Sequence, residues 1–135
     1  MTAQSTMPVS ILLSVYNGDA FLAALLRSLQ CQTHANWTLI WRDDGSTDQS
    51  RRIMQDFSDS LAGGRCLEVT QGGHHLGVAG SFGLLLEHVA DGHCVAFCDQ
   101  DDVWFPDKLE RALKALEPFC HTQVPAMYCS RQIMT

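Results

Sequence analysis

The chain has 135 residues, 46% of them apolar and 18% charged, an ordinary composition for a single soluble domain that can bury a core without disulfides or a metal. Its formal net charge of −6 argues against nucleic acid as the main partner, because phosphate binding needs clustered Lys and Arg. No leader peptide and no transmembrane run is visible, so we expect a cytoplasmic protein, with peripheral contact at the inner membrane face left open.

The first half of the chain predicts two strands and two helices. Residues 1–7 are polar and are expected to form a disordered tail, whereas residues 9–15 form an apolar run typical of a buried strand. Asp19 can cap the helix that follows, because the apolar positions after it fall on one helical face. Residues 37–41 predict the second strand, and residues 46–49 fit a capping box at the start of the second helix.

The second half continues the same alternation. Residues 66–70 and 94–98 predict the third and fourth strands, residues 126–130 predict a fifth, and Pro106 marks the start of a fourth helix. A third helix lies between the third and fourth strands. We expect this helix to bury one apolar face, formed by Val78, Phe82, Leu85, Leu86 and Val89.

This order predicts an α/β fold with a doubly wound, mostly parallel sheet and helices on both faces, since apolar strands that alternate with helices are covered on both sides. In such sheets, ligands bind beyond the carboxyl ends of the strands. Polar residues end three of the strands, and they are Ser14, Tyr16 and Asn17; Asp43, Asp44 and Ser46; and Asp99, Gln100, Asp101 and Asp102. We therefore expect these three groups to meet at one edge of the sheet.

The acidic group after the fourth strand is a candidate cation site. Its three carboxylates, at Asp99, Asp101 and Asp102, repel one another in a confined space, and a divalent cation would remove that repulsion. Oxygen ligands select hard ions such as Mg²⁺ or Mn²⁺ rather than zinc. The alternative is an acidic surface turn that only caps the helix at Pro106.

The other two groups also allow two interpretations each. Asp44 can accept a hydrogen bond from a nucleobase N–H, but residues 43–48 would also make a good turn and helix cap with no ligand. Tyr16 can stack on a flat ring or lie at the rim as an ordinary amphipathic side chain.

Three further features favour structural roles. His74 and His75 are adjacent and lack metal-ligand spacing, which indicates a solvated loop. Trp104 and Phe105 are expected to pack into the core and hold the loop after the fourth strand. The six cysteines form no C-x-x-C pair, and we expect them to be reduced, structural thiols.

Four ordered motifs resemble those of the family 2 glycosyltransferases. They are Val9-Ser-Ile-Leu-Leu-Ser-Val-Tyr-Asn-Gly18, Asp43-Asp-Gly-Ser-Thr-Asp48, Leu76-Gly77-Val78 and Cys98-Asp-Gln-Asp-Asp-Val-Trp-Phe-Pro-Asp-Lys-Leu109. The last motif also resembles a bacterial subgroup that includes rhamnosyltransferases of surface-polysaccharide assembly. The resemblance implies a GT-A fold in which residues 8–135 form the nucleotide-sugar-binding part, with the acceptor-binding half absent.

The same resemblance implies a role for each strand-end residue. Tyr16 would line the base pocket with Ser14 and Asn17 at the nucleoside, and Asp44 would bind the pyrimidine ring. Asp101 would contact the ribose or the metal, and Asp102 would coordinate the Mn²⁺ or Mg²⁺ that bridges the diphosphate.

The implied reaction is inverting transfer of a sugar from a UDP- or dTDP-linked donor to a saccharide or lipid-linked acceptor, in bacterial surface-polysaccharide synthesis. Two departures from the family pattern matter. Residues 79–82 read Ala-Gly-Ser-Phe where the family commonly has Ala-Arg-Asn, so a basic contact to the diphosphate is missing. The catalytic base is expected beyond residue 135, so we expect the chain alone to bind a nucleotide-sugar weakly and to transfer nothing.

Three other functions stay open at this point. A receiver-type module has a similar length and order, but it needs a lysine at a strand end, whereas Lys108 and Lys114 fall on a helix. A haloacid-dehalogenase-like phosphatase would use Asp99 and Asp101 and leave Asp43 to Asp48 unexplained. A truncated, non-catalytic remnant would fold and bind a nucleotide, or bind nothing.

Overall fold

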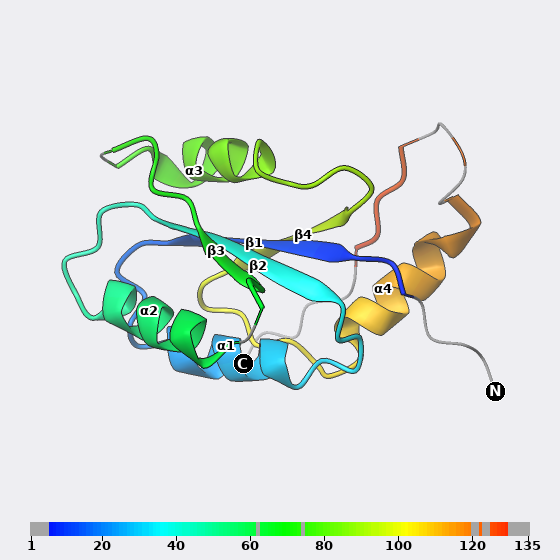
Figure 1. Cartoon of the computed structure of the whole chain (residues 1–135), viewed down its shortest axis with the longest axis horizontal. Coiled ribbons are helices and arrows are strands. Elements are labelled where there is room, and N and C mark those ends of the chain that lie inside the picture. The colour runs from blue at the N-terminus through cyan, green and yellow to red at the C-terminus, as the bar shows by residue number, and fades with distance from the viewer. Residues whose placement is uncertain (1–5, 62, 74, 120–121, 123–124, 130–135) are drawn as a thin grey trace.

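The computed structural model describes residues 6–61, 63–73, 75–119, 122 and 125–129. Four strands form one fully parallel sheet in the order β3-β2-β1-β4 (Figure 1). The strands are β1 (Val9–Val15), β2 (Trp37–Asp43), β3 (Cys66–Glu68) and β4 (Cys94–Asp99). The register pairs Ser14 with Arg42 of β2 and with Asp99 of β4, so the three strands end level at one edge.

Helices cover both faces of the sheet. They are α1 (Leu22–Gln30), α2 (Ser50–Ser60), α3 (Gly77–Leu86) and α4 (Lys108–Leu116), with a short 3₁₀ turn, η1 (Glu117–Phe119), after α4. Figure 1 shows α1 and α2 on one side of the sheet and α3 alone on the other. The predicted α/β fold with a parallel sheet and helices on both faces is confirmed.

The core lies mainly on the side of α1 and α2. Alternate β1 residues, such as Ile11 and Leu13, point to this side and pack with the leucines of α1, with Trp41 of β2 and with Leu109 of α4. The opposite side has a smaller cluster around Leu12, since α3 is the only helix there. Burial of each large apolar side chain contributes about 1.5–3 kcal/mol to folding, so the larger cluster contributes more to the stability of the fold than the smaller one.

Two of the strand predictions are wrong. Residues 126–129, which the fifth strand was expected to include, carry no strand, and residue 130 lies outside the described residues. The fourth strand is not buried on both faces, because Val95 is 39% exposed and Phe97 is 57% exposed. The physical reason is that β4 is an edge strand and α3 lies over β1 and β2 instead.

The predicted helix caps are also wrong. Neither α1 nor α2 has a side-chain cap, and they begin at Leu22 and Ser50. The carboxylate of Asp19 accepts the N–H of Gln49 at 3.2 Å, so it satisfies a donor before α2 rather than before α1. Asp48 accepts the N–H of Ser50, the first residue of α2, at 2.9 Å, although the N-cap is Gln49 and not the first residue of the predicted capping box.

The face that α3 buries differs from the predicted one. Only Ser81 and Leu85 are fully buried in this helix, whereas Val78 is 68% exposed and Leu86 is 44% exposed. A polar residue, Ser81, is therefore one of the two side chains that anchor this helix to the sheet.

The remaining sequence features are placed as follows. Residues 1–5 of the predicted tail lie outside the described residues, and the carbonyls of Thr6 and Met7 accept hydrogen bonds from Asn36 and His34. Among the residues that the structure describes, the cysteines are free thiols, namely Cys31, Cys66, Cys94, Cys98 and Cys129. Within the described residues, no helix combines the length and the apolar character that crossing a bilayer requires.

Candidate functional site

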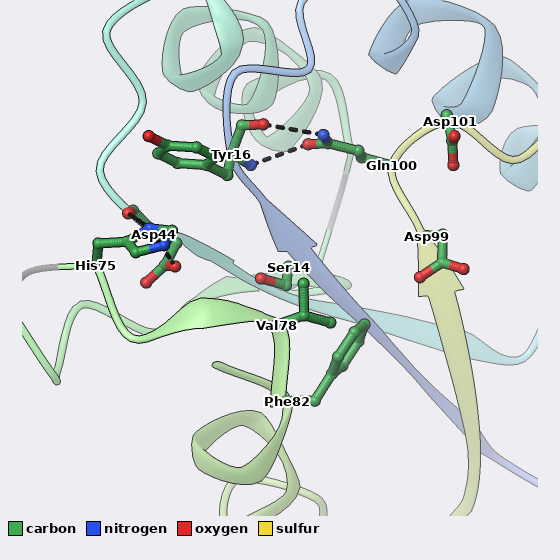
Figure 2. Close-up of a pocket in the computed structure, with 9 residues that line it drawn as sticks. All are labelled: Ser14, Tyr16, Asp44, His75, Val78, Phe82, Asp99, Gln100 and Asp101. Carbon is green, nitrogen blue, oxygen red and sulfur yellow. Dashed lines mark hydrogen bonds and ion pairs between the residues drawn. The ribbon is translucent and has the colours of Figure 1, made fainter. Parts of the chain in front are cut away.

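The carboxyl ends of β1, β2 and β4 surround a cavity of about 250 Å³ that α3 closes on the fourth side (Figure 2). The lining residues come from β1, β4 and α3 and from the loops after β1, β2 and β4 and before α3, and they are Ser14, Tyr16, Asp44, His75, Val78, Phe82, Asp99, Gln100 and Asp101. The cavity has an apolar wall on the α3 side and carboxylates on the β2 and β4 sides. An arrangement of this kind suits a ligand with one flat apolar part and one polar or charged part.

Asp44 anchors the β2 side of the cavity although it is only 2% exposed. Its Oδ1 accepts the N–H of Leu76 at 2.7 Å, and its Oδ2 accepts the N–H of Gly77 at 3.0 Å. These are orphan donors at the start of α3, so the carboxylate caps that helix. Gly77 has a φ of 79°, a left-handed conformation that glycine adopts without strain, and this turn brings both N–H groups to the carboxylate.

A buried arginine balances the charge of Asp44. Arg42 is 1% exposed and forms an ion pair with Asp44, while its Nε donates to the carbonyl of Gln71 at 2.9 Å. Burial alone would raise the pKa of Asp44, but the hydrogen bonds from Leu76, Arg42 and Gly77 outweigh it and hold the pKa below its ordinary value. The carboxylate is therefore ionised at neutral pH.

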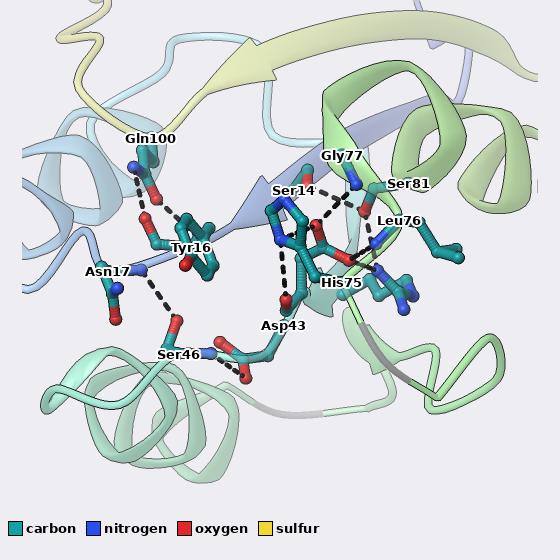
Figure 3. A network of polar contacts seen from close by, with 12 residues as sticks. Ser14, Tyr16, Asn17, Asp43, Ser46, His75, Leu76, Gly77, Ser81 and Gln100 are labelled. Atoms are coloured by element: carbon teal, nitrogen blue, oxygen red, sulfur yellow. Dashed lines mark hydrogen bonds and ion pairs between the residues drawn. The ribbon is translucent and has the colours of Figure 1, made fainter.

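Ser14 is tied to the same network through α3 (Figure 3). Its hydroxyl donates to the hydroxyl of Ser81 at 2.8 Å, and Ser81 also accepts from Arg42 at 3.2 Å. Ser81 is fully buried, which explains why a polar residue anchors α3 to the sheet. Against the expected Ala-Arg-Asn triplet, Gly80 stands at the basic position and Ser81 at the Asn position, so the polar group that orders the site is a hydroxyl.

Tyr16 is held at the rim by its backbone. Its N–H donates to Oε1 of Gln100, and its carbonyl accepts from Nε2 of Gln100, both at 2.9 Å. The phenol ring is free of this clamp, is part of a residue that is 44% exposed, and lies 4.7 Å from the ring of His75. The ring therefore borders the cavity as an aromatic surface, against which the His75 ring lies.

Asn17 does not line the cavity. Its backbone has a φ of 47°, its N–H donates to the hydroxyl of Ser46 at 2.9 Å, and its Oδ1 accepts the N–H of Thr47 at 2.8 Å. These bonds join the loop after β1 to the loop after β2. Asn17 therefore holds in place the loop that carries Tyr16.

The acidic loop after β4 does not bring its three carboxylates together. Asp99 and Asp101 line the cavity, whereas Asp102 accepts the backbone N–H of Asp99 at 3.3 Å. Burial, together with the negative charges of Asp102 and Asp101, raises the pKa of Asp99. Within the described residues, no cluster of three or more His, Cys, Asp or Glu side chains could hold a metal by itself.

The family model described as glycosyl transferase family 2 matches residues 10–128, which include every residue of the cavity. This chain belongs to glycosyl transferase family 2. The membership decides against the receiver-type and phosphatase alternatives. In agreement with this, Lys108 and Lys114 lie on α4 rather than at a strand end.

Two curated relatives of this family 2 chain come from Escherichia coli, and both are UDP-Glc:alpha-D-GlcNAc-diphosphoundecaprenol beta-1,3-glucosyltransferases. WfgD is 34% identical over 108 residues, which are 80% of this chain and 40% of WfgD. WfaP is 30% identical over 109 residues, which are 81% of this chain and 41% of WfaP. The chain therefore spans about two fifths of the length of these relatives.

Solved structures show the same fold. S. aureus TarS 1-349 in complex with UDP-GlcNAc has a TM-score of 0.71 at 24% identity, over 83% of this chain and 32% of the TarS chain. The mannosyltransferase PcManGT of Pyrobaculum calidifontis, in complex with GDP-Man and Mn²⁺, has a TM-score of 0.73 at 22% identity, over 84% of this chain and 34% of that one. The family 2 chain thus has the GT-A fold.

The structure brings together four of the six residues singled out as ligand contacts. Ser14, Tyr16, Asp44 and Asp101 line one cavity, whereas Asn17 and Asp102 lie beside it. Trp104 is buried as expected, and its N–H donates to Ser28. The core prediction for Phe105 is wrong, because this residue is 61% exposed.

Arg42, Gln100 and His75 are among the residues of the family 2 chain whose roles at the site were not predicted from the sequence. Arg42 carried a signal, since it is a charge within an apolar strand and lies two residues before Asp44, on the same face. Gln100 had no sequence feature that distinguished it from the acidic residues beside it. His75 lies in a loop and its side chain is 58% exposed, as expected, but its Nδ1 also lies 2.9 Å from Oδ2 of Asp44, a contact that the sequence did not predict; His74 lies outside the described residues.

Proposed function

We propose that this chain is the donor-binding part of an inverting, metal-dependent glycosyltransferase of bacterial surface-polysaccharide synthesis. The donor is a UDP-linked sugar, with a dTDP-linked sugar as the alternative if the rhamnosyltransferase-like resemblance holds. The acceptor is a saccharide or a lipid-linked saccharide. The observation that carries the proposal is the convergence of Tyr16, Asp44 and Asp101 from three strand ends on one cavity.

The two sides of the cavity suit the two ends of such a donor. The Tyr16 ring offers a face for the base, and the ionised Asp44 offers an acceptor for a base N–H. Ser14 lies between them at the end of β1, at the level of the nucleoside. The names of WfgD and WfaP, with UDP-glucose as donor, support a uracil base in this position.

The acidic β4 side suits the diphosphate and a cation. Asp99, Asp101 and Asp102 place negative charge there, which together with burial raises the pKa of Asp99, and a hard divalent ion would offset that charge. Asp101 and Asp102 would hold Mn²⁺ or Mg²⁺, which usually keeps water and substrate phosphates as its other ligands, so a complete protein cage is not needed. Such an ion acts as a Lewis acid toward the leaving diphosphate.

The chain's own residues position the donor rather than the acceptor. Arg42 and Ser81 fix Asp44 and Ser14, and Gln100 fixes Tyr16, so the base and ribose contacts are ordered before a ligand binds. We propose that the base that deprotonates the acceptor hydroxyl lies in the part of a full-length enzyme that these 135 residues do not include. The chain alone is then expected to bind a donor without transferring sugar.

Isothermal titration calorimetry with UDP, GDP and dTDP, with and without Mn²⁺, tests the proposal. We expect the pyrimidine diphosphates to bind better than GDP, and Mn²⁺ to increase the affinity. Asp102→Ala should remove the effect of Mn²⁺, whereas Asp44→Asn should weaken binding with and without the metal. Asp59→Ala, which removes an exposed carboxylate on α2, is the matched control.

Two outcomes would contradict the proposal. Unchanged affinity in both site variants would show that nucleotide binds elsewhere. Absence of binding to the unmodified chain under all conditions would favour the non-catalytic remnant that binds nothing.

A further inference from the structure

His75 fills the space where the proposed function requires the nucleobase. Its ring lies against the Tyr16 ring, with 4.7 Å between centroids and an interplanar angle of 52°. Its Nδ1 lies 2.9 Å from Oδ2 of Asp44 and 3.4 Å from the Asp44 backbone carbonyl. Both partners are acceptors, so Nδ1 carries a hydrogen and acts as the donor. The imidazole thus makes the two contacts assigned to a base, one with an aromatic face and one with a carboxylate (Figure 2).

The carboxylate has no acceptor position left for a second donor. Two carboxylate oxygens offer about four lone-pair positions. Oδ1 of Asp44 accepts from Arg42 and Leu76, and Oδ2 accepts from Gly77 and His75. A base N–H that reaches this carboxylate must therefore replace one of the four partners.

His75 is the partner that can leave. Arg42 is buried, and the N–H groups of Leu76 and Gly77 are fixed at the start of α3. The His75 side chain is 58% exposed, so its departure uncovers little apolar surface. A polar contact made by one exposed side chain contributes little net free energy, which a stacked and hydrogen-bonded base can exceed.

We propose that His75 is an exchangeable occupant of the base subsite, which leaves Tyr16 and Asp44 when a nucleobase binds. The inference rests on the proposed function, because it takes the cavity as the nucleotide site. It makes His75 a positioning residue that keeps Tyr16 and Asp44 in place in the free protein and lowers the affinity for the base. Ligands that lack a base would not compete with it.

The test is calorimetry with UDP and with ribose 5-phosphate, both with Mn²⁺, on the unmodified chain, His75→Ala and His88→Ala. His88→Ala removes a second exposed histidine, after the end of α3. We expect His75→Ala to bind UDP about two- to fivefold more tightly than the unmodified chain, as loss of a competing exposed polar contact implies. Its affinity for ribose 5-phosphate should not change, and His88→Ala should behave as the unmodified chain.

Three results would overturn the inference. Equal or weaker UDP binding by His75→Ala would make His75 a wall of the pocket instead of a competitor. An equal gain for ribose 5-phosphate would place the competition away from the base. If UDP binds to none of the three proteins, the proposed function itself fails and the inference fails with it; in the first two cases UDP binds and the proposed function stands.

A second measurement needs no substitution. Proton NMR of the unmodified chain reports the ring protons of His75, which the nearby Tyr16 ring shifts in the free protein. UDP should move these resonances and ribose 5-phosphate should leave them in place. Resonances that do not respond to saturating UDP would show that His75 stays on Tyr16, which contradicts the exchange.

Discussion

Arg42 and Asp44 are the residues on which the geometry of the site depends most. Both side chains are nearly inaccessible to solvent, and buried charges are tolerated only when they are paired and hydrogen-bonded. Here the arginine binds Asp44, Ser81 and the carbonyl of Gln71, so one guanidinium joins β2, α3 and the loop before α3. The pair therefore links the stability of the fold to the placement of the acceptor that the base would use.

Replacing Arg42 by methionine should strongly destabilise the chain. The substitution leaves Asp44 ionised in a buried site with its charge unbalanced, which typically costs about 3–5 kcal/mol. The two N–H bonds from α3 remain, so we expect a value near the lower limit. Urea denaturation followed by tryptophan fluorescence measures it.

The control for this prediction is Arg51→Met, which breaks the ion pair with Glu68. The Arg51 side chain is 55% exposed, so the loss should not exceed about 1 kcal/mol. Adding Asp44→Asn to Arg42→Met should recover part of the stability. Equal losses in Arg42→Met and Arg51→Met would show that the buried pair has no special role.

At the residue scale, the sequence predicted which polar residues lie at the strand ends better than it predicted which residues hydrogen-bond to them. Tyr16 and Asp44 could be placed because strand ends of a parallel sheet share an edge. The role of His75 could not be predicted, because its contact with Asp44 depends on how the loop before α3 folds back over β2. A single sequence contains no periodicity that reports such a contact.

At the scale of elements, the site depends on loops that bind one another. The loop after β1 is joined to the loop after β2 through Asn17 and Asp19, and to the loop after β4 through Gln100. Each junction uses a side-chain group on one loop and a backbone group on the other. Three loops that would be mobile separately are thereby fixed as one rim.

Gln100→Ala should weaken UDP binding more than it weakens the fold. It removes two hydrogen bonds to the Tyr16 backbone, which together contribute about 1–3 kcal/mol, and it frees the loop that carries the tyrosine ring. Gly18→Ala should act in the same direction, because its Cβ would lie 2.4 Å from Oε1 of Gln100 and displace that side chain. Calorimetry with UDP, combined with urea denaturation, separates the two effects.

Gln55→Ala is the matched control for the clamp. It removes the hydrogen bond from Gln55 to Glu68, which joins α2 to β3 away from the cavity. We expect its UDP affinity to equal that of the unmodified chain. If Gln100→Ala keeps full affinity for UDP, the clamp on Tyr16 does not contribute to binding.

Sequence patterns predicted the strands and helices well, but they predicted poorly how the helices are capped and which residues are buried. The first four strands and all four helices occur in the expected order, because apolar periodicity reports burial. The buried face of α3 was wrong because Ser81 enters the network of Arg42, which apolar periodicity does not report. The cap expected from Asp19 was wrong because its carboxylate accepts the N–H of Gln49, just before α2, rather than a donor at the start of α1.

At the scale of the whole molecule, the sheet is covered unequally. On the α3 side, the edge strand β4 exposes Val95 and Phe97. The Phe97 ring packs edge to face against the Phe82 ring of α3, with 5.5 Å between the ring centroids. Val78 and Leu86 of α3 are exposed as well. An edge strand with exposed apolar side chains is a ready site for pairing between chains.

We therefore expect the 135-residue chain to self-associate as its concentration rises, and Phe97→Lys to suppress this. A lysine on an edge strand opposes association because pairing would bury its charge. Phe119→Lys is the matched control, since Phe119 is 48% exposed but lies in the turn after α4, away from β4. Sedimentation velocity over a concentration series should show larger species for the unmodified chain and for Phe119→Lys, and a monomer for Phe97→Lys. A monomeric unmodified chain, or equal suppression by both lysines, would show that β4 is not the associating edge.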